Sequence, residues 1–258
     1  MKKTIYTILL SVFGIMALSA QTAEERGLEI AKAAEAADQG FESAIVDLKM
    51  TLKNKNGQTS ERSLSNRILE LTEDGDKSLI VFNSPKDVKG TATLTYTHKV
   101  GADDQWLFLP AVERVKRISS SNKSGPFVGS EFAYEDLSSQ EVEKYSYKFL
   151  KEEGSLLFVE QDPVDLKSGY TRRIATYNKD KGYRLEKIEF YDRKNSLLKT
   201  LTYSDYKLYK GKFWRALSLN MVNHQSNKET LLQFSEYNFG AGLSDSDFTE
   251  VALIRAGK

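Results

Sequence analysis

The sequence predicts a mainly β protein in which one large antiparallel sheet curls into a barrel or half-barrel behind a single N-terminal helix. Near residue 40 the spacing of apolar residues changes from about 3.6, the period of a helix, to 2, the period of a strand. About a dozen alternating segments follow, and short turns join many of them, which means antiparallel pairing. A sheet of this size curls because strand twist accumulates and open edges invite unwanted pairing. Side chains do not usually fill so large a barrel, so we expect a ligand cavity inside it.

The first twenty residues have the pattern of a secretory signal peptide. Two lysines precede an apolar run over residues 5–18, and small residues follow up to Ala20, after which we expect cleavage. A membrane-spanning helix is the competing interpretation, but the run is shorter than the roughly 20 apolar residues that a bilayer requires. The absence of cysteine excludes a lipid-anchored lipoprotein and a disulfide scaffold. We therefore expect a signal peptide over 1–20 and one soluble, exported domain over 21–258.

Residues 22–39 predict an amphipathic helix. Alanines recur about one helical turn apart, Thr22 and Glu25 have the spacing of a capping box, and Gly40 supplies a stop signal. The apolar stripe is thin. We therefore expect this helix to lie over another element rather than to form a core by itself.

Strand-like alternation begins after Gly40. The first candidate, 44–52, alternates apolar with charged and polar residues, and the NKNG turn at 54–57 is typical of a β-hairpin. The other candidates are 63–72, 77–83, 92–98, 105–109, 115–118, 143–150, 156–161, 171–178, 184–191, 197–206, 213–223 and 229–237. A capped short helix is expected over 243–255.

Charge and residue content exclude several classes of function. Without the two lysines of the signal peptide, 35 of the 37 basic residues remain, against 36 acidic ones. The mature chain therefore lacks the excess of positive charge that is typical of nucleic-acid-binding domains. The two histidines, His98 and His224, stand in unrelated strands, so we expect no metal site and no cofactor. No cysteine, nucleophile elbow or phosphate loop is present, and paired acidic residues such as Asp103 and Asp104 are interpreted as solvated turn charges. We therefore do not expect an enzyme.

Aromatic residues are abundant instead. Thirteen tyrosines, thirteen phenylalanines and two tryptophans are present, and many occupy alternate strand positions. They form either an ordinary core or the lining of a cavity for acyl chains. The block LPAVERVKRISSSNKSGPFVGSEFAYEDL at 109–137, with its basic cluster and its aromatic-acidic end, has the composition of a site.

Four segments carry a resemblance to a known family. They are FNSPKDVKGTATL at 82–94, DDQWLFLPAVERVKRI at 103–118, GSEFAYEDL at 129–137 and DFTEVAL at 247–253. With these segments the sequence resembles the outer-membrane lipoprotein-sorting family of LolA/LolB-type periplasmic carriers, and most of all the LolA-like branch found beside RND-type exporters. The resemblance implies an incomplete antiparallel β-barrel with a helical lid over a hydrophobic cavity that takes the acyl chains of lipoproteins or lipids.

The resemblance also implies candidate site residues. We expect six side chains to contact or cap the cavity: Trp106, Phe108, Val112, Phe127, Phe132 and Tyr134. In LolA members an arginine near the cavity mouth helps to hold the lid shut, and Arg114 or Arg117 is the candidate here. Glu135 or Asp136 is expected to pair with this basic cluster. An ordinary hairpin with a solvated charge pair is the alternative interpretation of the same residues.

The function expected from the resemblance is that of a non-enzymatic periplasmic carrier, acting as a monomer in transport toward the outer membrane. An RND-type inner-membrane exporter is the expected partner besides the acyl chains. A lipid- or lipoprotein-sensing regulatory module of the same fold, acting on a membrane partner, is the alternative. A hydrolase acting on a lipid or cell-wall substrate ranks behind both.

Overall fold

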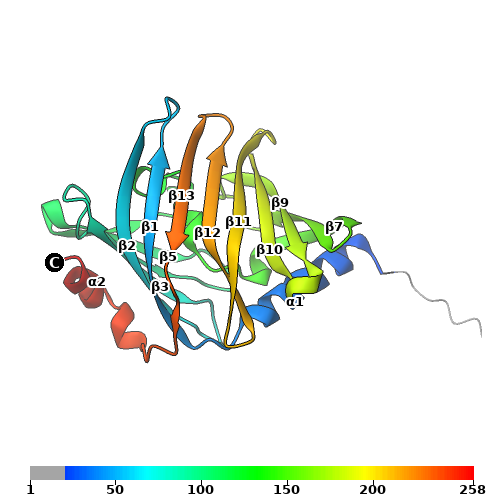
Figure 1. Cartoon of the computed structure of the whole chain (residues 1–258), viewed down its shortest axis with the longest axis horizontal. Coiled ribbons are helices and arrows are strands. Elements are labelled where there is room, and N and C mark those ends of the chain that lie inside the picture. Colours follow the sequence, from blue (N-terminus) through cyan, green and yellow to red (C-terminus); the bar gives the residue numbers. More distant parts are fainter. Residues whose placement is uncertain (1–20) are drawn as a thin grey trace, which may run out of the picture.

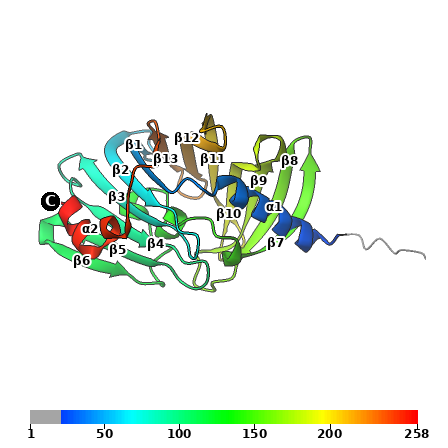
Figure 2. The same cartoon turned by 90° about the horizontal axis from the view of Figure 1, so that it is seen from below.

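The computed structural model of the protein describes residues 21–258, so the expected signal peptide lies outside the described residues. In this part of the chain 14 strands form one sheet in the order β6-β5-β4-β3-β2-β1-β13-β12-β11-β10-β9-β8-β7, and β14 pairs with β1. Neighbouring strands are antiparallel. The sheet is strongly bent (Figures 1 and 2), yet its end strands β6 and β7 do not pair with each other. The expected incomplete barrel is therefore confirmed.

The strands agree closely with the predicted segments. Their bounds are β1 Ser43–Lys53, β2 Thr59–Leu69, β3 Lys77–Ser84, β4 Ala92–Tyr96, β5 Asp104–Leu109, β6 Arg114–Ile118, β7 Tyr145–Glu153, β8 Leu156–Pro163, β9 Tyr170–Asn178, β10 Arg184–Asp192, β11 Leu197–Tyr209, β12 Phe213–Asn223, β13 Lys228–Phe234 and β14 Asn238–Phe239. The hairpin predicted at 54–57 joins β1 to β2. There Gly57 takes a positive φ of 81°, and the Asn54 side chain accepts hydrogen bonds from the backbone N–H groups of Asn56 and Gln58.

Helix α1 (Ala23–Asp38) is the predicted N-terminal helix. Its capping box is formed by Thr22 and Glu25, and its buried residues Gly27, Ile30 and Ala31 mark one narrow face. This face packs mainly on β7, so α1 lies over the half of the sheet that contains β7 to β10 (Figure 2). Among the described residues, no helix is long and apolar enough to span a membrane.

The predicted C-terminal helix is a short 3₁₀ turn, η6 (Asp245–Phe248), followed by α2 (Glu250–Ala256). Together they cover the other half of the sheet, beside β4 and β5 (Figure 2). Phe248 and Leu253 are fully buried in a separate core cluster with residues of β3, β4 and β5. The two ends of the open sheet are therefore covered by different helices.

The connection between the two end strands, residues 119–144, contains no strand. It forms three short 3₁₀ turns, η2 (Phe127–Gly129), η3 (Tyr134–Leu137) and η4 (Val142–Lys144), and its aromatic side chains enter the main core. This segment partly fills the space that the bent sheet encloses. The remaining space lies toward α1.

Candidate ligand cavity

A cavity of about 480 Å³ lies between α1 and the sheet. One wall is the inner face of α1, which contributes Ala31 and Ala34. The second wall is formed by residues of β2, β3 and β7 to β13, and the third by residues 137–142. The volume falls within the roughly 300–1,000 Å³ of small-molecule sites.

The N-terminal half of α1 is held against β7 by close packing. A Cβ atom on Gly27 would lie 2.9 Å from the backbone nitrogens of Lys148 and Phe149, so only glycine fits at this crossing. Arg26 next to it pairs with Glu152, with 2.6 Å between Nη2 and Oε2, and lies 3.8 Å above the Phe149 ring. The helix therefore shields the outer edge strand of the sheet.

The C-terminal end of α1 is held by the β11–β12 connection and the start of β12. Arg215 forms an ion pair with Asp38, and Lys212 donates a hydrogen bond to the backbone carbonyl of Gln39. Asp38 and the Lys212 and Arg215 side chains also line the cavity. These polar contacts therefore hold the end of α1 at the edge of the cavity lining.

Tyrosines dominate the sheet wall. The residues concerned are Tyr147, Tyr177, Tyr183, Tyr203, Tyr206 and Tyr237. Burial raises the pKa of Tyr147, Tyr177 and Tyr203 above the ordinary tyrosine value, at which the hydroxyl is already neutral near pH 7. Apolar residues such as Ile188, Leu219 and Phe234 complete the wall. The lining therefore offers large ring surfaces together with a few hydrogen-bonding groups.

A row of inward-facing side chains crosses β7, β8, β9 and β10. Tyr147 is paired with Gln161, Gln161 with Arg173, and Arg173 with Phe190. Residues directly opposite each other on neighbouring strands share one face of the sheet, so the four side chains are neighbours. Gln161 donates to the Tyr177 hydroxyl at 2.7 Å and accepts a hydrogen bond from Arg173 Nε at 2.5 Å. Two adjacent polar side chains, Gln161 and Arg173, therefore lie between aromatic residues in this part of the sheet.

Acidic side chains gather near residues 138–142. Carboxylate oxygens of Glu35, Glu141 and Glu143 lie within 4.8 Å of one another. Burial, followed by repulsion from Asp76 and Glu35, raises the pKa of Glu141 to about 7. Burial also raises the pKa of Asp76 to about 6. The spacing of the three glutamates would suit a cation, but near neutral pH a proton on Glu141 relieves the repulsion in this cluster.

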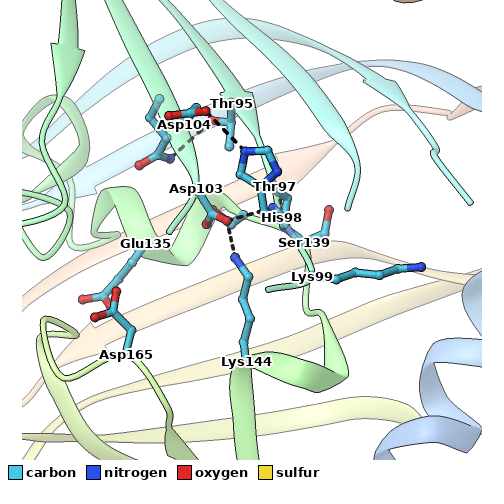
Figure 3. Close-up of polar contacts among 12 residues, drawn as sticks. Thr95, Thr97, His98, Lys99, Asp103, Asp104, Glu135, Ser139, Lys144 and Asp165 are labelled. Atoms are coloured by element: carbon cyan, nitrogen blue, oxygen red, sulfur yellow. Dashed lines mark hydrogen bonds and ion pairs between the residues drawn. The ribbon is translucent and has the colours of Figure 1, made fainter. Parts of the chain in front are cut away.

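The third wall is fixed to the ends of β4 and β5 (Figure 3). Lys144 forms an ion pair with Asp103, and the backbone N–H of Ser139 donates to Thr97 Oγ1 at 3.2 Å. Further along the same connection, Gln105 Nε2 donates to the carbonyl of Tyr134 at 3.0 Å. Segment 137–142 is thus a fixed wall rather than a loose loop.

His98 belongs to the same polar network (Figure 3). Its Nδ1 lies 2.6 Å from Asp74 and its Nε2 lies 3.3 Å from Asp104, and the hydrogen bond to Asp74 raises its pKa. Both ring nitrogens therefore contact carboxylates. This histidine therefore links the turn at Asp74 to the start of β5.

The six aromatic and apolar residues expected at the cavity lie elsewhere than in the lining beneath α1. Phe108 is buried under α2, and Trp106 packs against the same cluster with its ring 5.0 Å from that of Tyr96. Val112 lies in the turn η1 (Pro110–Val112) and is 58% exposed. Pro110 follows directly on β5 and begins this turn.

Phe127, Phe132 and Tyr134 are brought together inside the main core. Their exposed fractions are 1%, 3% and 9%, and the Phe127 ring packs against those of Phe82 and Tyr134. Phe132 also lines a second, more open hollow of about 530 Å³ beside Lys199. These aromatics fill part of the barrel interior next to the cavity.

None of the four charged residues of the expected cluster pairs with another of the four. Arg117 pairs with Asp104 and Arg114 is exposed. Asp136 forms a buried ion pair with Lys199, with 2.6 Å between carboxylate and ammonium. Glu135 accepts hydrogen bonds from Ser168 and Gly169. The expected pairing between the basic cluster and these acids is therefore not seen, because Glu135 and Asp136 turn inward and the β6 arginines do not.

Sequence reasoning missed the lining of the cavity, which comes mostly from α1 and from β8 to β13. A signal was present in the strands themselves. Gln161 and Arg173 are polar residues. The alternation of buried and less buried positions along β8 and β9 nevertheless puts both of them on the buried face of the sheet. A buried polar side chain is informative, because burial costs free energy unless the group has a partner.

Comparisons with known proteins agree with this fold. A family described only as "uncharacterized protein" matches residues 74–255. A domain assigned to outer membrane lipoprotein sorting from Vibrio parahaemolyticus is 51% identical, covers 90% of this chain and 100% of its own, and superposes with a TM-score of 0.88. A DUF1329 family protein from Desulfovibrio piger is 26% identical over 90% of this chain and 99% of its own, with a TM-score of 0.84.

More distantly, a LolA superfamily protein from Nitrosomonas europaea shares the fold, with 20% identity, a TM-score of 0.69, and coverage of 90% of this chain and 100% of its own. Curated proteins gave no match. The 51% identity to the Vibrio parahaemolyticus domain over 90% of this chain decides the family assignment. The structure from Nitrosomonas europaea shows that the fold is shared more widely. The chain therefore belongs to the family of outer membrane lipoprotein-sorting proteins and has the incomplete barrel of the LolA superfamily.

Proposed function

We propose that the protein is a periplasmic carrier that binds the acyl chains of lipoproteins or lipids in the cavity beneath α1 and moves them toward the outer membrane. The observation that carries the proposal is the covered cavity itself. It is enclosed between one helix and a bent sheet, and rings and aliphatic side chains form much of its lining. The named relative from Vibrio parahaemolyticus supports the same assignment.

The energetics of an acyl chain explain why such a cover is needed. Each methylene moved out of water gains about 0.8 kcal/mol, so a long chain left exposed would return to a bilayer or aggregate. A soluble carrier must offer comparable apolar burial and still release its cargo. A helix that is held by few contacts can open when cargo binds the open form more tightly than the closed one.

The contacts of α1 fit that requirement. Its ion pairs with Glu152 and Arg215 are partly exposed, and such pairs contribute little to stability. Its buried face consists of a few small or medium side chains, with Ile30 the largest fully packed one. The cover is therefore weakly attached compared with the strands beneath it.

A binding role without catalysis is part of the proposal. The titratable groups that line the cavity include tyrosines with raised pKa values, carboxylates such as Glu141, and basic side chains such as Arg173 and Lys212. These groups suit recognition of a polar head beside an acyl chain. Regulation of a membrane partner by the same binding event has no separate observation in its favour.

The test uses a fluorescent, synthetic triacylated lipopeptide as cargo. The protein should keep the lipopeptide soluble, co-elute with it in gel filtration and pass it to acceptor vesicles. The variant Ala34→Trp places a large side chain in the cavity from the inner face of α1 and should abolish co-elution. The matched control Ala36→Trp puts the same side chain on an exposed position of the same helix and should leave it unchanged. Equal binding by both variants would refute binding beneath α1.

A further inference from the structure

Arg173 is a buried cation without a carboxylate partner. Its residue is 5% exposed, and among residues 21–258 no Asp or Glu oxygen lies within 4.0 Å of its guanidinium. Its partners are a neutral amide, Gln161, and the Tyr145 ring, which the guanidinium covers at 3.7 Å. A buried charge is costly unless it is paired, so this arrangement calls for a counter-ion.

The guanidinium is open toward the cavity. Arg173 belongs to the cavity lining, together with Gln161 and Tyr147 on the neighbouring strands. Gln161 Oε1 accepts a hydrogen bond from the Nε–H group, and no described residue accepts a hydrogen bond from Nη1 or Nη2. The two terminal nitrogens are the pair that binds carboxylate and phosphate oxygens in a bidentate manner.

The neighbouring carboxylates are already occupied. Asp136 is paired with Lys199, and both side chains are 4% exposed. Glu135 takes hydrogen bonds from Ser168 and Gly169 and lies 3.9 Å from Lys123. The charge on Arg173 is thus left without a close counter-ion among the described residues, although Lys199, the other buried basic residue of residues 21–258, has one.

Two further buried polar atoms in the cavity lining are unpartnered. Ser138 Oγ and Asn66 Oδ1 have no hydrogen-bond partner among the described residues. Buried polar groups are nearly always hydrogen-bonded in native proteins. Both atoms are also closed to water, so they lack a partner without being open to a ligand in the cavity.

We propose that the cavity selects an amphiphile with an anionic head, a carboxylate or a phosphate, which accepts hydrogen bonds from Nη1 and Nη2 of Arg173 while its acyl chain lies against the tyrosine wall. This inference rests on the proposed function and goes beyond it, because acyl burial alone gives no preference for charge. Gln161 acts as a positioning residue, since it fixes the guanidinium plane through Nε.

The experiment compares ligands of one chain length by displacement of a bound fluorescent fatty acid. Dodecanoate and dodecyl phosphate should each bind the wild-type protein at least about tenfold more tightly than dodecanol, as a hydrogen bond to a charged group implies. Inorganic phosphate, which lacks the chain, should not displace the probe. Equal affinity for dodecanoate and dodecanol would overturn the inference and leave the carrier function standing. If no chain-bearing ligand displaced the probe, both would fail.

Two variants separate recognition from structure. Arg173→Met keeps the length and packing of the side chain, and it should lower the affinity for dodecanoate to that for dodecanol while leaving dodecanol binding unchanged. Arg173→Lys keeps the charge and should retain part of the preference. A purely structural arginine would instead reduce both affinities together in the methionine variant. The wild-type preference needs no variant and therefore tests the inference even if Arg173→Met fails to fold.

Discussion

The contact between Gly27 and β7 allows a prediction whose sign separates two physical effects. In an isolated helix, replacing an interior glycine by alanine stabilises the helix by about 1 kcal/mol. Here the new methyl group would lie 2.9 Å from the backbone nitrogens of Lys148 and Phe149, and backbone atoms cannot swing away as a flexible side chain does. Overpacking of this kind costs about 1–3 kcal/mol. We therefore expect Gly27→Ala to leave the free energy of unfolding between unchanged and about 2 kcal/mol lower.

Urea denaturation measures this free energy directly, and hydrogen exchange of the β7 amides reports whether α1 has lifted. The control Ala36→Gly, on the exposed side of the same helix, should cost about 1 kcal/mol through helix propensity alone. A Gly27→Ala protein that is more stable by the full propensity gain, with unchanged exchange in β7, would show that α1 does not rest on the strand as described.

Two further predictions concern buried charge. Because the pKa of Glu141 is raised to about 7, the folded protein keeps a proton that the unfolded chain releases at lower pH, so the free energy of unfolding should fall as pH rises from about 4.5 through 7. Glu141→Gln should flatten this slope in urea titrations at pH 5 and pH 8, and an unchanged slope would contradict the assignment. Lys199→Met leaves Asp136 buried without its cation and should cost about 3–5 kcal/mol, with partial recovery in the double variant that adds Asp136→Asn. A loss below about 1 kcal/mol would mean that Asp136 is not buried as an ion.

The strands were predictable from the sequence because their signals are local. Alternation of apolar and polar residues, the NKNG turn at 54–57 and the Thr22–Glu25 capping box each depend on residues within a few positions of one another. The bend followed from the number of strands, which predicts a barrel or half-barrel, whereas the incomplete closure was implied by the family resemblance. Local patterns therefore sufficed for the mainly β class and for both helices.

The cavity was not predictable in the same way, because its walls meet only after the sheet has bent. The sequence motif around Trp106 and Phe108 has the composition of a site, yet α2 from the other end of the chain buries Phe108 and packs against Trp106. Arg173 carries no motif. That Arg173 lacks a counter-ion can be seen only in the folded structure. There β8 and β9 are paired so that Gln161 lies beside Arg173, and the nearby carboxylate of Asp136 is already paired with Lys199.

The central claim is that the space beneath α1 holds an acyl chain. Native mass spectrometry of the protein isolated gently from cells that express the full chain tests it most directly. The account predicts a population carrying an additional mass that fragments to an acyl-bearing molecule, and predicts its loss in Ala34→Trp but not in Ala36→Trp. A wild-type protein that remains free of any such mass, even after incubation with the triacylated lipopeptide, would contradict the claim.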